Sequence, residues 1–293
     1  MKFIEQGGGH EEKDSIRIVC SPVCICWNCL CITLRKIFRR RDRTNKRKPQ
    51  VGLYNHPTME TPGPGDNQYP VIVWGNGWGG NNNAGESTTD GYKPGLIEWA
   101  LDGPYIVIAA NQWSVQESDI LACIQWIVVQ NTTPTSEYYG VVNTAKIGLA
   151  GHSQGGGAVI KAGDGEPNGF DITAVVAMNP YGPSWVDAGN QDGPVMLLGG
   201  RDDLLTPVSS FILAWEAIKS DDQGGILAIL QGGNHNDDAW GPEDEDPTDY
   251  NFGRYQKVTE LWWQFTLNDK EQAGAQLKRL LDKAPWVTEY FPE

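Results

Sequence analysis

Short apolar runs alternate with longer amphipathic segments from Tyr69 onward. The apolar runs lack polar alternation, which is typical of parallel strands buried beneath helices on both faces of a sheet. Strand and helix patterns alternate, so the predicted fold class is α/β, with a doubly wound, mostly parallel sheet and helices on both faces. We predict strands at 70–74, 105–110, 146–150, 172–178, 194–199 and 225–230, and helices at 93–101, 118–131, 154–162, 207–219, 254–267 and 271–283.

Composition divides the chain into three parts. Residues 1–50 form a basic, Cys-rich leader, residues 51–68 a Pro/Gly-rich linker, and residues 69–293 the predicted α/β domain. The leader carries 12 Lys/Arg and 5 Asp/Glu, a formal charge of +7, whereas residues 51–293 carry 11 and 32, a charge of −21. So acidic a body repels phosphate backbones, which argues against nucleic acid as a partner, and it disfavours anionic substrates.

The leader leaves several interpretations open. Its apolar stretch at 18–34 precedes a polybasic run at 35–49, the reverse of the order in a cleaved signal peptide, so no signal peptide is predicted. A signal anchor with a cytoplasmic body, or palmitoylated cysteines beside the basic run, would bring residues 16–49 into contact with a membrane. A disordered leader and a misassigned translation start are the alternatives.

The positions of the cysteines give little information about the predicted α/β domain. Five of the six lie between Cys20 and Cys31, and only Cys123 lies in the predicted domain. We therefore expect no disulfide within that domain, and cysteine usage gives no support for an oxidising compartment. The single C-x-x-C pair, Cys26 and Cys29, has no second pair and no nearby histidine, so no metal site is predicted.

A candidate nucleophile lies in a glycine-flanked turn. The segment 151–155 reads G-H-S-Q-G, follows the strand at 146–150 and begins the helix at 154–162. This is a G-x-S-x-G motif in the strand–turn–helix setting that it requires, and its glycines allow the sharp turn that raises a serine hydroxyl above the sheet. We predict Ser153 as the nucleophile; a plain helix N-cap is the alternative role.

The serine needs a base, because its hydroxyl is a weak nucleophile at neutral pH unless a neighbouring group takes its proton, and the histidines are the candidates. Of the four histidines, His10 and His56 fall in the leader and the linker, and His152 lies beside the nucleophile rather than facing it. His235 remains, after the strand at 225–230, where ligands meet sheets of this kind. A surface histidine in a polar loop is the alternative interpretation.

The acid is expected between the nucleophile and the base, because proteins with this motif order the triad Ser, Asp/Glu, His. Asp202 and Asp203 both follow the strand at 194–199. We prefer Asp203, since Asp202 can serve as a turn-forming residue. Its role would be to orient the imidazole and stabilise the imidazolium.

Two backbone N–H groups are predicted to stabilise an oxyanion. Gln154 follows the nucleophile at a helix N-terminus, whose dipole favours negative charge. The loop after the strand at 70–74 reads G-N-G-W-G-G, and there Asn76 is the first choice and Gly77 the second. This loop lacks the G-x-x-x-x-G-K-[ST] pattern and any nearby lysine, so a nucleotide site is not predicted.

These motifs resemble the polyesterase–lipase–cutinase family, which includes bacterial cutinases and PET hydrolases, over about residues 68–285. GHSQGGG at 151–157 is similar to the family's GHSMGGG, and DLLTPV at 203–208 resembles its D-x-x-A-P-V acid segment. The stretch at 254–269 is similar to the family's closing helix. The resemblance implies an α/β-hydrolase fold and supports Asp203 as the acid.

The resemblance also implies an aromatic substrate site. The segment at 179–185 lies where the family carries an aromatic side chain that packs against the substrate, with Tyr181 the first choice and Trp185 the second. Trp78 and Trp240 would join them in lining an apolar acyl site. Core packing is the alternative role for each of these side chains.

The implied activity is hydrolysis of small-molecule or polymeric carboxylic esters by a Ser-His-Asp triad, without a metal or organic cofactor, and secretion follows by family analogy. The chain departs from the family's pattern at positions expected to lie near the substrate. Gln154 replaces a methionine, Asn76 replaces an aromatic residue, and an acidic insertion at 237–250 follows His235. The alternatives are a chlorophyllase-like or dienelactone hydrolase-like enzyme and a non-catalytic binding protein of the same fold. No oligomeric state is predicted.

Overall fold

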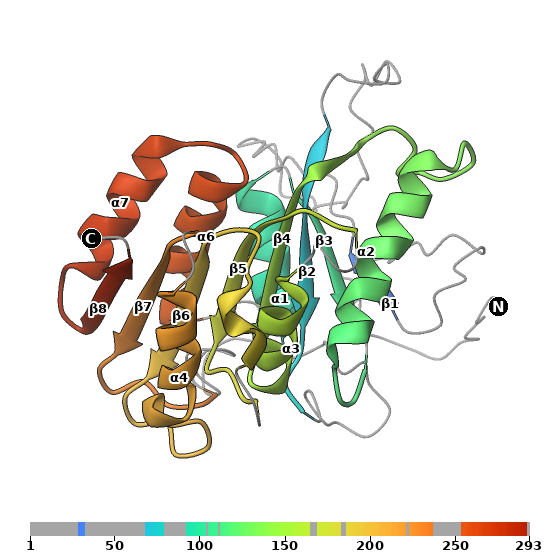
Figure 1. Ribbon diagram of the computed structural model, residues 1–293. Coiled ribbons are helices and arrows are strands. Elements are labelled where there is room, and N and C mark those ends of the chain that lie inside the picture. The colour runs from blue at the N-terminus through green and yellow to red at the C-terminus, as the bar shows by residue number, and fades with distance from the viewer. Residues whose placement is uncertain are drawn as a thin grey trace, which may run out of the picture.

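Eight strands form one sheet, in the order β1-β3-β2-β4-β5-β6-β7-β8, in a computed structural model of the chain (Figure 1). The structure describes residues 29–32, 68–78, 92–103, 105–110, 112–164, 169–182, 186–220, 223–236 and 253–291. The rest of the predicted leader, nearly all of the linker, Trp185 and the acidic insertion at 237–250 lie outside the described residues. Expectations for those segments stay predictions.

The six predicted strands are present, and each runs parallel to its neighbours among them. They are β2 (Tyr69–Gly75), β3 (Ile106–Ala110), β4 (Val142–His152), β5 (Ile172–Met178), β6 (Val195–Gly200) and β7 (Gly225–Leu230). β4 begins four residues before its predicted start at 146. Its first half is partly exposed and polar, and only the second half is the continuous apolar run that the sequence pattern detects.

Two antiparallel strands at the sheet edges were not predicted. β1 (Cys29–Ile32) pairs with β3, and β8 (Trp286–Phe291) pairs with β7. Along β8, half-buried positions alternate with exposed ones over most of its length, so no continuous apolar run marks it. β1 lies within the segment predicted as a leader. Antiparallel edge strands on an otherwise parallel sheet are common in α/β folds.

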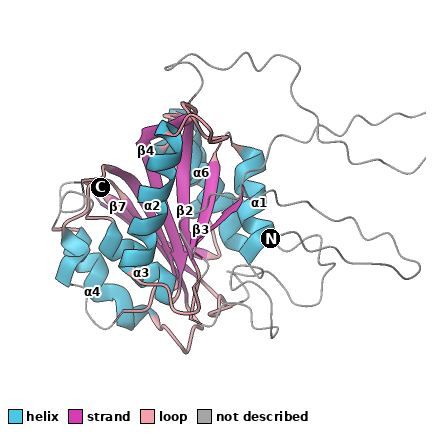
Figure 2. Cartoon of the chain, turned by 90° about the vertical axis from the view of Figure 1, so that its right-hand side faces the viewer, coloured by secondary structure: helices cyan, strands magenta, loops and turns pink. Residues whose placement is uncertain are grey.

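Helices cover both faces of the sheet, as the edge-on view in Figure 2 shows. On one face lie α2 (Glu117–Thr132), α3 (Gln154–Ala162) and α4 (Val208–Ile218). On the other face lie α1 (Lys93–Asp102), α6 (Arg254–Thr266) and α7 (Glu271–Leu281). The 3₁₀ helix η3 (Val186–Gly189) precedes β6. Each of the six α-helices matches its predicted range within two residues at either end. The doubly wound α/β fold is therefore confirmed.

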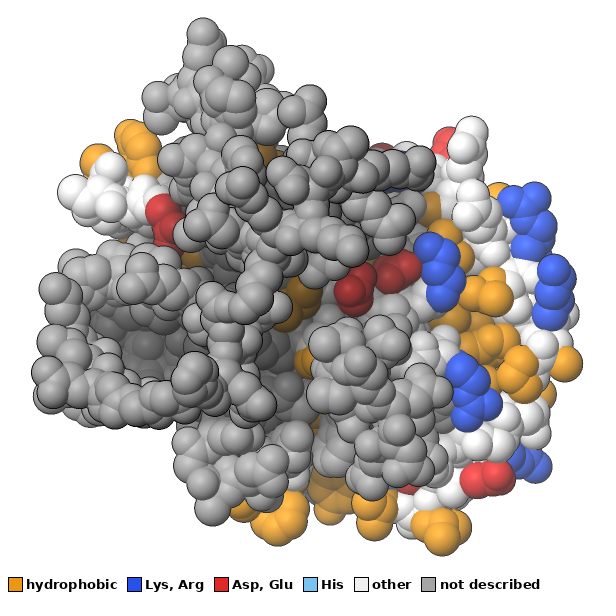
Figure 3. Space-filling view, turned by 180° about the vertical axis from the view of Figure 1, so that it is seen from behind, with side chains coloured by type: hydrophobic (Ala, Val, Ile, Leu, Met, Phe, Trp, Pro, Cys, Tyr) orange, Lys and Arg blue, Asp and Glu red, His pale blue; other side chains and the backbone are white. Residues whose placement is uncertain are grey.

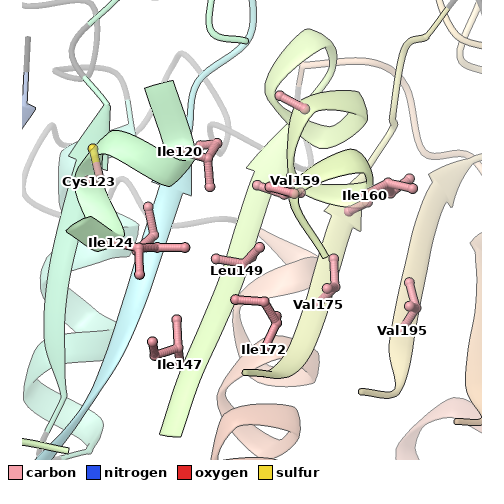
Figure 4. Close-up of a cluster of buried hydrophobic side chains, with 14 of the residues drawn as sticks. Ile120, Cys123, Ile124, Ile147, Leu149, Val159, Ile160, Ile172, Val175 and Val195 are labelled. Atoms are coloured by element: carbon pink, nitrogen blue, oxygen red, sulfur yellow. The ribbon is translucent and has the colours of Figure 1, made fainter. Parts of the chain in front are cut away.

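Each layer of helices encloses its own apolar core. Leu149 of β4 belongs to one core with Ile124 of α2 and Val159 of α3 (Figure 4). In the other core, Trp99 of α1 meets Trp263 of α6 edge to face, with ring centroids 5.8 Å apart. Burying one such side chain contributes about 1.5–3 kcal/mol relative to leaving it exposed. The helices thereby hold the sheet from both sides.

Cys123 lies in the core beneath α2, α3 and α4 (Figure 4). It is disulfide-bonded. Its partner lies outside the described side chains. A bonded cysteine departs from the expectation that the cysteines give no support for an oxidising compartment, because disulfides persist mainly in oxidising surroundings. The bond was not predicted, because the other five cysteines all lie in residues 20–31 and pairing between distant segments has no local sequence pattern.

The strand order places four loops at one edge of the sheet. From β2, the chain continues to β3 on one side and then returns to β4 on the other. In open α/β sheets, ligands bind at the carboxyl ends of the strands beside such a reversal. Asn76, Ser153, Asp203 and His235 follow β2, β4, β6 and β7 respectively, so all four share this edge.

Among the described residues, no helix combines the length and apolarity needed to cross a bilayer. Within the same part of the chain, no cluster of three or more His, Cys, Asp or Glu side chains is arranged to hold a metal ion. Seen from behind, basic, acidic and hydrophobic side chains are interspersed on the side that carries α7 and β8 (Figure 3).

Candidate active site

A single residue joins the end of β4 to the start of α3. This residue, Ser153, has φ 53° and ψ −118°. A positive φ costs a residue with a side chain about 1–3 kcal/mol, and such backbone strain persists only where the surroundings enforce it. The conformation is the strained strand-to-helix turn that a G-x-S-x-G motif predicts.

Two glycines make this turn possible by lacking a side chain. A Cβ on Gly151 would lie 2.4 Å from the carbonyl oxygen of Gly155, and a Cβ on Gly155 would lie 2.1 Å from that of Gly75. Neither distance is compatible with a real side chain, so both positions require glycine. The second contact also presses the loop after β2 against the turn that carries Ser153.

Ser153, His235 and Asp203 lie in one chain of hydrogen-bonding atoms. Ser153 Oγ is 3.0 Å from His235 Nε2, and His235 Nδ1 is 2.7 Å from Asp203 Oδ2. An ionised carboxylate only accepts, so Nδ1 carries the imidazole proton and Nε2 is left to accept the serine hydroxyl. The Asp203 side chain is fully buried, and that of His235 is 12% exposed. The arrangement has the reach that proton transfer from the hydroxyl to the imidazole needs.

Asp203 is held as a carboxylate by several donors. Its Oδ1 accepts the backbone N–H groups of Leu205 and Thr206, both at 2.8 Å, and its Oδ2 also accepts the Thr206 hydroxyl at 2.6 Å. Burial is the largest single influence and by itself raises the pKa of this carboxyl. Hydrogen bonds from His235 and Thr206 together outweigh burial and lower the pKa of Asp203 to about 2.

The neighbouring aspartate is placed differently. Asp202 is exposed, and its backbone N–H donates to the carbonyl of Gly233 at 2.8 Å. The structure therefore brings Asp203, and not Asp202, to His235.

Two backbone N–H groups beside the serine are candidates for stabilising negative charge. Gln154 is the first residue of α3, so the helix itself cannot satisfy its N–H. Asn76 is fully buried, and its side-chain amide donates to the carbonyl of Gln112 at 2.8 Å, which ties its loop to the next one. The N–H of Gly77, the second choice in this loop, donates to Tyr92 Oη at 3.2 Å. That bond leaves Asn76 as the preferred donor of the loop.

Large apolar side chains are exposed around the same edge of the sheet. They lie on the loops after β2, β3, β5 and β6 and are Trp78, Trp113, Tyr181, Leu204 and Leu205. Leu204 is 92% exposed, and the rings of Trp78 and Trp113 meet edge to face with centroids 6.3 Å apart. Clusters of this kind mark surfaces that meet an apolar partner or ligand. Trp185 and Trp240 lie outside the described residues.

A groove of about 670 Å³ lies beside the serine, between the first turn of α2 and one face of α3. Gln154 and Tyr181, which both line it, flank Ser153: Gln154 follows it, and the backbone N–H of Tyr181 donates to its carbonyl at 2.8 Å. The rest of the lining mixes apolar and polar side chains, namely Val115, Leu121, Ala158, Gln116, Glu117, Ser118 and Lys161. The groove therefore adjoins the turn that carries Ser153.

Three polar residues beneath the site were not predicted from the sequence to support it. Thr206 bonds to Asp203, while His152 Nε2 and Asn179 Nδ2 lie 2.8 and 3.0 Å from the backbone carbonyl oxygen of His235. For Thr206 a local signal existed, because a hydroxyl three residues after an aspartate in a turn is placed to bond to it. For the other two the partner is more than fifty residues away along the chain. Contacts between such distant residues cannot be predicted from a local sequence pattern.

Comparisons with known proteins agree with this geometry. A protein-family model described as PETase, PET hydrolase-like, matches residues 105–241, a range that contains Ser153, Asp203 and His235. A search among curated proteins finds no significant match. The sheet topology and this match are consistent with an α/β-hydrolase similar to PET hydrolases and cutinases, and the match supports a hydrolase of ester substrates.

Proposed function

We propose that the protein is a serine hydrolase that cleaves carboxylic esters through an acyl-enzyme. Ser153 is the nucleophile, His235 the general base and Asp203 the orienting acid. The observation that carries the proposal is the pair of short contacts to His235, 3.0 Å from Ser153 Oγ and 2.7 Å from Asp203 Oδ2. The family match over 105–241 supports the same chemistry.

In the first half-reaction, Ser153 Oγ attacks the ester carbonyl carbon while His235 Nε2 takes the hydroxyl proton. The carbonyl oxygen becomes an oxyanion, which the backbone N–H groups of Gln154 and Asn76 stabilise. Asp203 stays ionised, because its pKa is about 2, and it stabilises the imidazolium. The intermediate expels the alcohol, which receives its proton from His235, and the acyl group remains on Ser153.

In the second half-reaction, water attacks the acyl carbonyl and gives one proton to His235. The tetrahedral intermediate then breaks its bond to Ser153 Oγ, which recovers that proton, and the carboxylic acid leaves. The same two backbone donors stabilise the second oxyanion. Each half-reaction returns His235 to its neutral form, so one imidazole serves both steps.

The substrates proposed are neutral esters with apolar acyl or alcohol parts, as small molecules or polymers. Exposed apolar side chains around the site, Leu204 and Tyr181 among them, favour such groups. The charge of −21 on residues 51–293 disfavours anionic esters.

Replacing Ser153 tests the proposal. Ser153→Ala should lower the turnover of p-nitrophenyl butyrate by at least about 10⁴-fold, since removing one member of such a triad leaves only the other contributions. Ser209→Ala, which removes an exposed serine on α4, is the matched control and should keep wild-type turnover. A fluorophosphonate probe should label the wild-type protein and the control but not Ser153→Ala.

Other outcomes identify the alternatives. Wild-type protein that neither turns over esters nor reacts with the probe would be a non-catalytic binding protein of this fold. In a substrate panel, turnover confined to lactones would instead favour a dienelactone hydrolase-like enzyme. Turnover confined to phytyl esters would favour a chlorophyllase-like enzyme.

A further inference from the structure

His152 is a buried histidine that the proposed chemistry does not use. It follows Gly151 in the turn before Ser153, and its side chain is almost completely inaccessible to solvent. Its Nε2 lies 2.8 Å from the backbone carbonyl oxygen of His235. A carbonyl oxygen only accepts, so this nitrogen carries a proton and donates.

The other ring nitrogen of His152 faces a tyrosine. Nδ1 lies 2.8 Å from the hydroxyl oxygen of Tyr92, the residue directly before α1. Burial, with a smaller effect of the nearby His235 charge, lowers the pKa of His152 to about 3, so the ring is neutral at ordinary pH. With the proton on Nε2, Nδ1 is an acceptor, and the Tyr92 hydroxyl donates to it.

The tyrosine completes the connection to the loop after β2. Tyr92 Oη accepts the backbone N–H of Gly77 at 3.2 Å. A Cβ on Gly77 would lie 3.0 Å from Tyr92 Oη, 3.2 Å from His152 Nδ1 and 3.3 Å from Ser153 Cβ, so this backbone passes close to all three residues. The hydrogen bonds therefore run in one direction, from Gly77 through Tyr92 and His152 to His235.

We propose that Tyr92 and His152 are positioning residues that couple the loop carrying the oxyanion donor to the loop carrying the catalytic base. One end of the connection fixes the backbone at Gly77, next to Asn76; the other fixes the backbone of His235. The ring of His152 packs against the ring of His235, with centroids 4.7 Å apart, and its hydrogen bond goes to the backbone carbonyl of His235. The inference rests on the proposed ester hydrolysis at Ser153.

Placement of the His235 backbone matters because this residue comes from a loop. In the described residues 231–236, which follow β7, no helix or strand contains His235, and side-chain donors hold its carbonyl. His152 supplies one donor, and Asn179 Nδ2 supplies a second at 3.0 Å. Displacement of a reacting group by about 1 Å costs about 10²-fold in rate, so a loosened loop should lower kcat.

Tyr92→Phe is the main test, because it removes one hydroxyl and keeps the ring that packs on Trp74, with centroids 5.0 Å apart. With p-nitrophenyl butyrate, we expect kcat to fall about 10- to 100-fold while KM changes less than twofold. Tyr105→Phe is the matched control. It also removes a buried tyrosine hydroxyl, which accepts from Asn268 at 2.8 Å, but it lies before β3, at the opposite edge of the sheet.

Variants of His152 separate the two halves of the connection. The amide of His152→Gln can reach the position of Nε2 and donate to His235, whereas His152→Leu provides no donor. We expect kcat of the glutamine variant to exceed that of the leucine variant about tenfold, the value of one hydrogen bond. In the His152→Leu background, Tyr92→Phe should cause little further loss, because residues acting as one unit are not additive.

Three results would overturn the inference. One is a Tyr92→Phe variant with the same kcat as Tyr105→Phe at similar stability. A second is equal kcat for His152→Gln and His152→Leu. The third, which does not depend on turnover, comes from ¹⁵N-correlated NMR of the four imidazoles: His152 should remain the neutral Nε2–H tautomer from pH 5 to pH 8, and titration in that range refutes the assigned direction.

Failure of the proposed function itself has a separate signature. Wild-type protein would then show neither turnover nor fluorophosphonate labelling, and the positioning role would fall with it. Labelled wild-type protein combined with an unaffected Tyr92→Phe variant would overturn the positioning role alone.

Discussion

Replacing Thr206 with valine removes one hydroxyl from the Asp203 site and changes the side-chain volume little. In the structure, this hydroxyl lies 2.6 Å from Asp203 Oδ2 and 3.0 Å from the backbone carbonyl oxygen of Asn179. A hydroxyl has one proton, and the shorter contact to a charged acceptor receives it. Hydrogen bonds to charged groups contribute about 1.5–3 kcal/mol. Because the two backbone donors to Oδ1 remain, we expect the lower part of that range, about 1.5–2 kcal/mol at pH 7.

The pH dependence of this loss tests its cause. The folded pKa of Asp203 is about 2 and the ordinary value is 3.8, so folding favours the ionised carboxylate. Its contribution of about 2–3 kcal/mol is fully present above pH 4 and is lost as the pH falls through 2. The valine variant raises the folded pKa toward the ordinary value. The difference between the two proteins should therefore be constant from pH 7 to pH 5 and shrink below pH 4.

Urea denaturation of the wild type and of Thr206→Val at pH 7, 5 and 3 measures this difference. At pH 7 the free energy of unfolding should fall by about 1.5–2 kcal/mol, and in a thermal melt the melting temperature should fall by about 3–8 °C. Thr206→Ser keeps the hydroxyl and is the matched control, which should recover most of the loss. A loss of stability that is the same at all three pH values, or that the serine variant fails to recover, would show that methyl packing and not the hydroxyl determines the effect.

Three further predictions concern the site. Asp203→Asn should lower kcat for p-nitrophenyl butyrate by about 10⁴-fold with little change in KM, because the imidazole loses its orienting charge; steady-state kinetics checks this. Gly155→Ala should abolish soluble folded protein or lower its melting temperature by more than about 10 °C, since the new Cβ would lie 2.1 Å from the Gly75 carbonyl oxygen, as a thermal melt would detect. The double variant Leu204→Ser/Leu205→Ser should turn over an emulsified triglyceride about tenfold more slowly and a soluble ester at the wild-type rate, whereas Leu213→Ser, exposed on α4, should leave both rates unchanged.

The parts of the fold that can be predicted from sequence are those whose pattern is local. The parallel strands are continuous apolar runs because helices cover both of their faces, and each of the six was predicted. β8 is an edge strand whose half-buried and exposed positions alternate, so its pattern differs little from that of a loop or an exposed helix. The disulfide bond of Cys123 was missed for a related reason, since pairing between distant segments leaves no periodic signal.

The residues of the candidate site also fall into those that have a local sequence pattern and those that do not. Ser153 can be predicted because its turn imposes glycines at fixed spacing, and Asp203 and His235 because each follows a strand that ends at the same edge. The sequence gives no reason why His152 bonds to a residue 83 positions later. Its position beside the nucleophile correctly indicated that it does not face Ser153, but the function of its ring depends on which loops pack around it.

Backbone strain at the site lies at two residues, each anchored to a neighbouring strand. Ser153 and Asn179 are two of the three non-glycine residues with positive φ in the described part of the chain, and they directly follow the adjacent strands β4 and β5. The N–H of Ser153 donates to Met178 O at 2.9 Å, and that of Asn179 donates to Leu198 O at 2.7 Å, so both turns are anchored to the next strand. Each such bond contributes about 0.5–1.5 kcal/mol, comparable with the strain of about 1–3 kcal/mol at each residue. Because Ser153 carries the hydroxyl that faces His235 and Asn179 holds the loop of His235, a change that relaxes either turn should separate the hydroxyl from the imidazole before it unfolds the sheet.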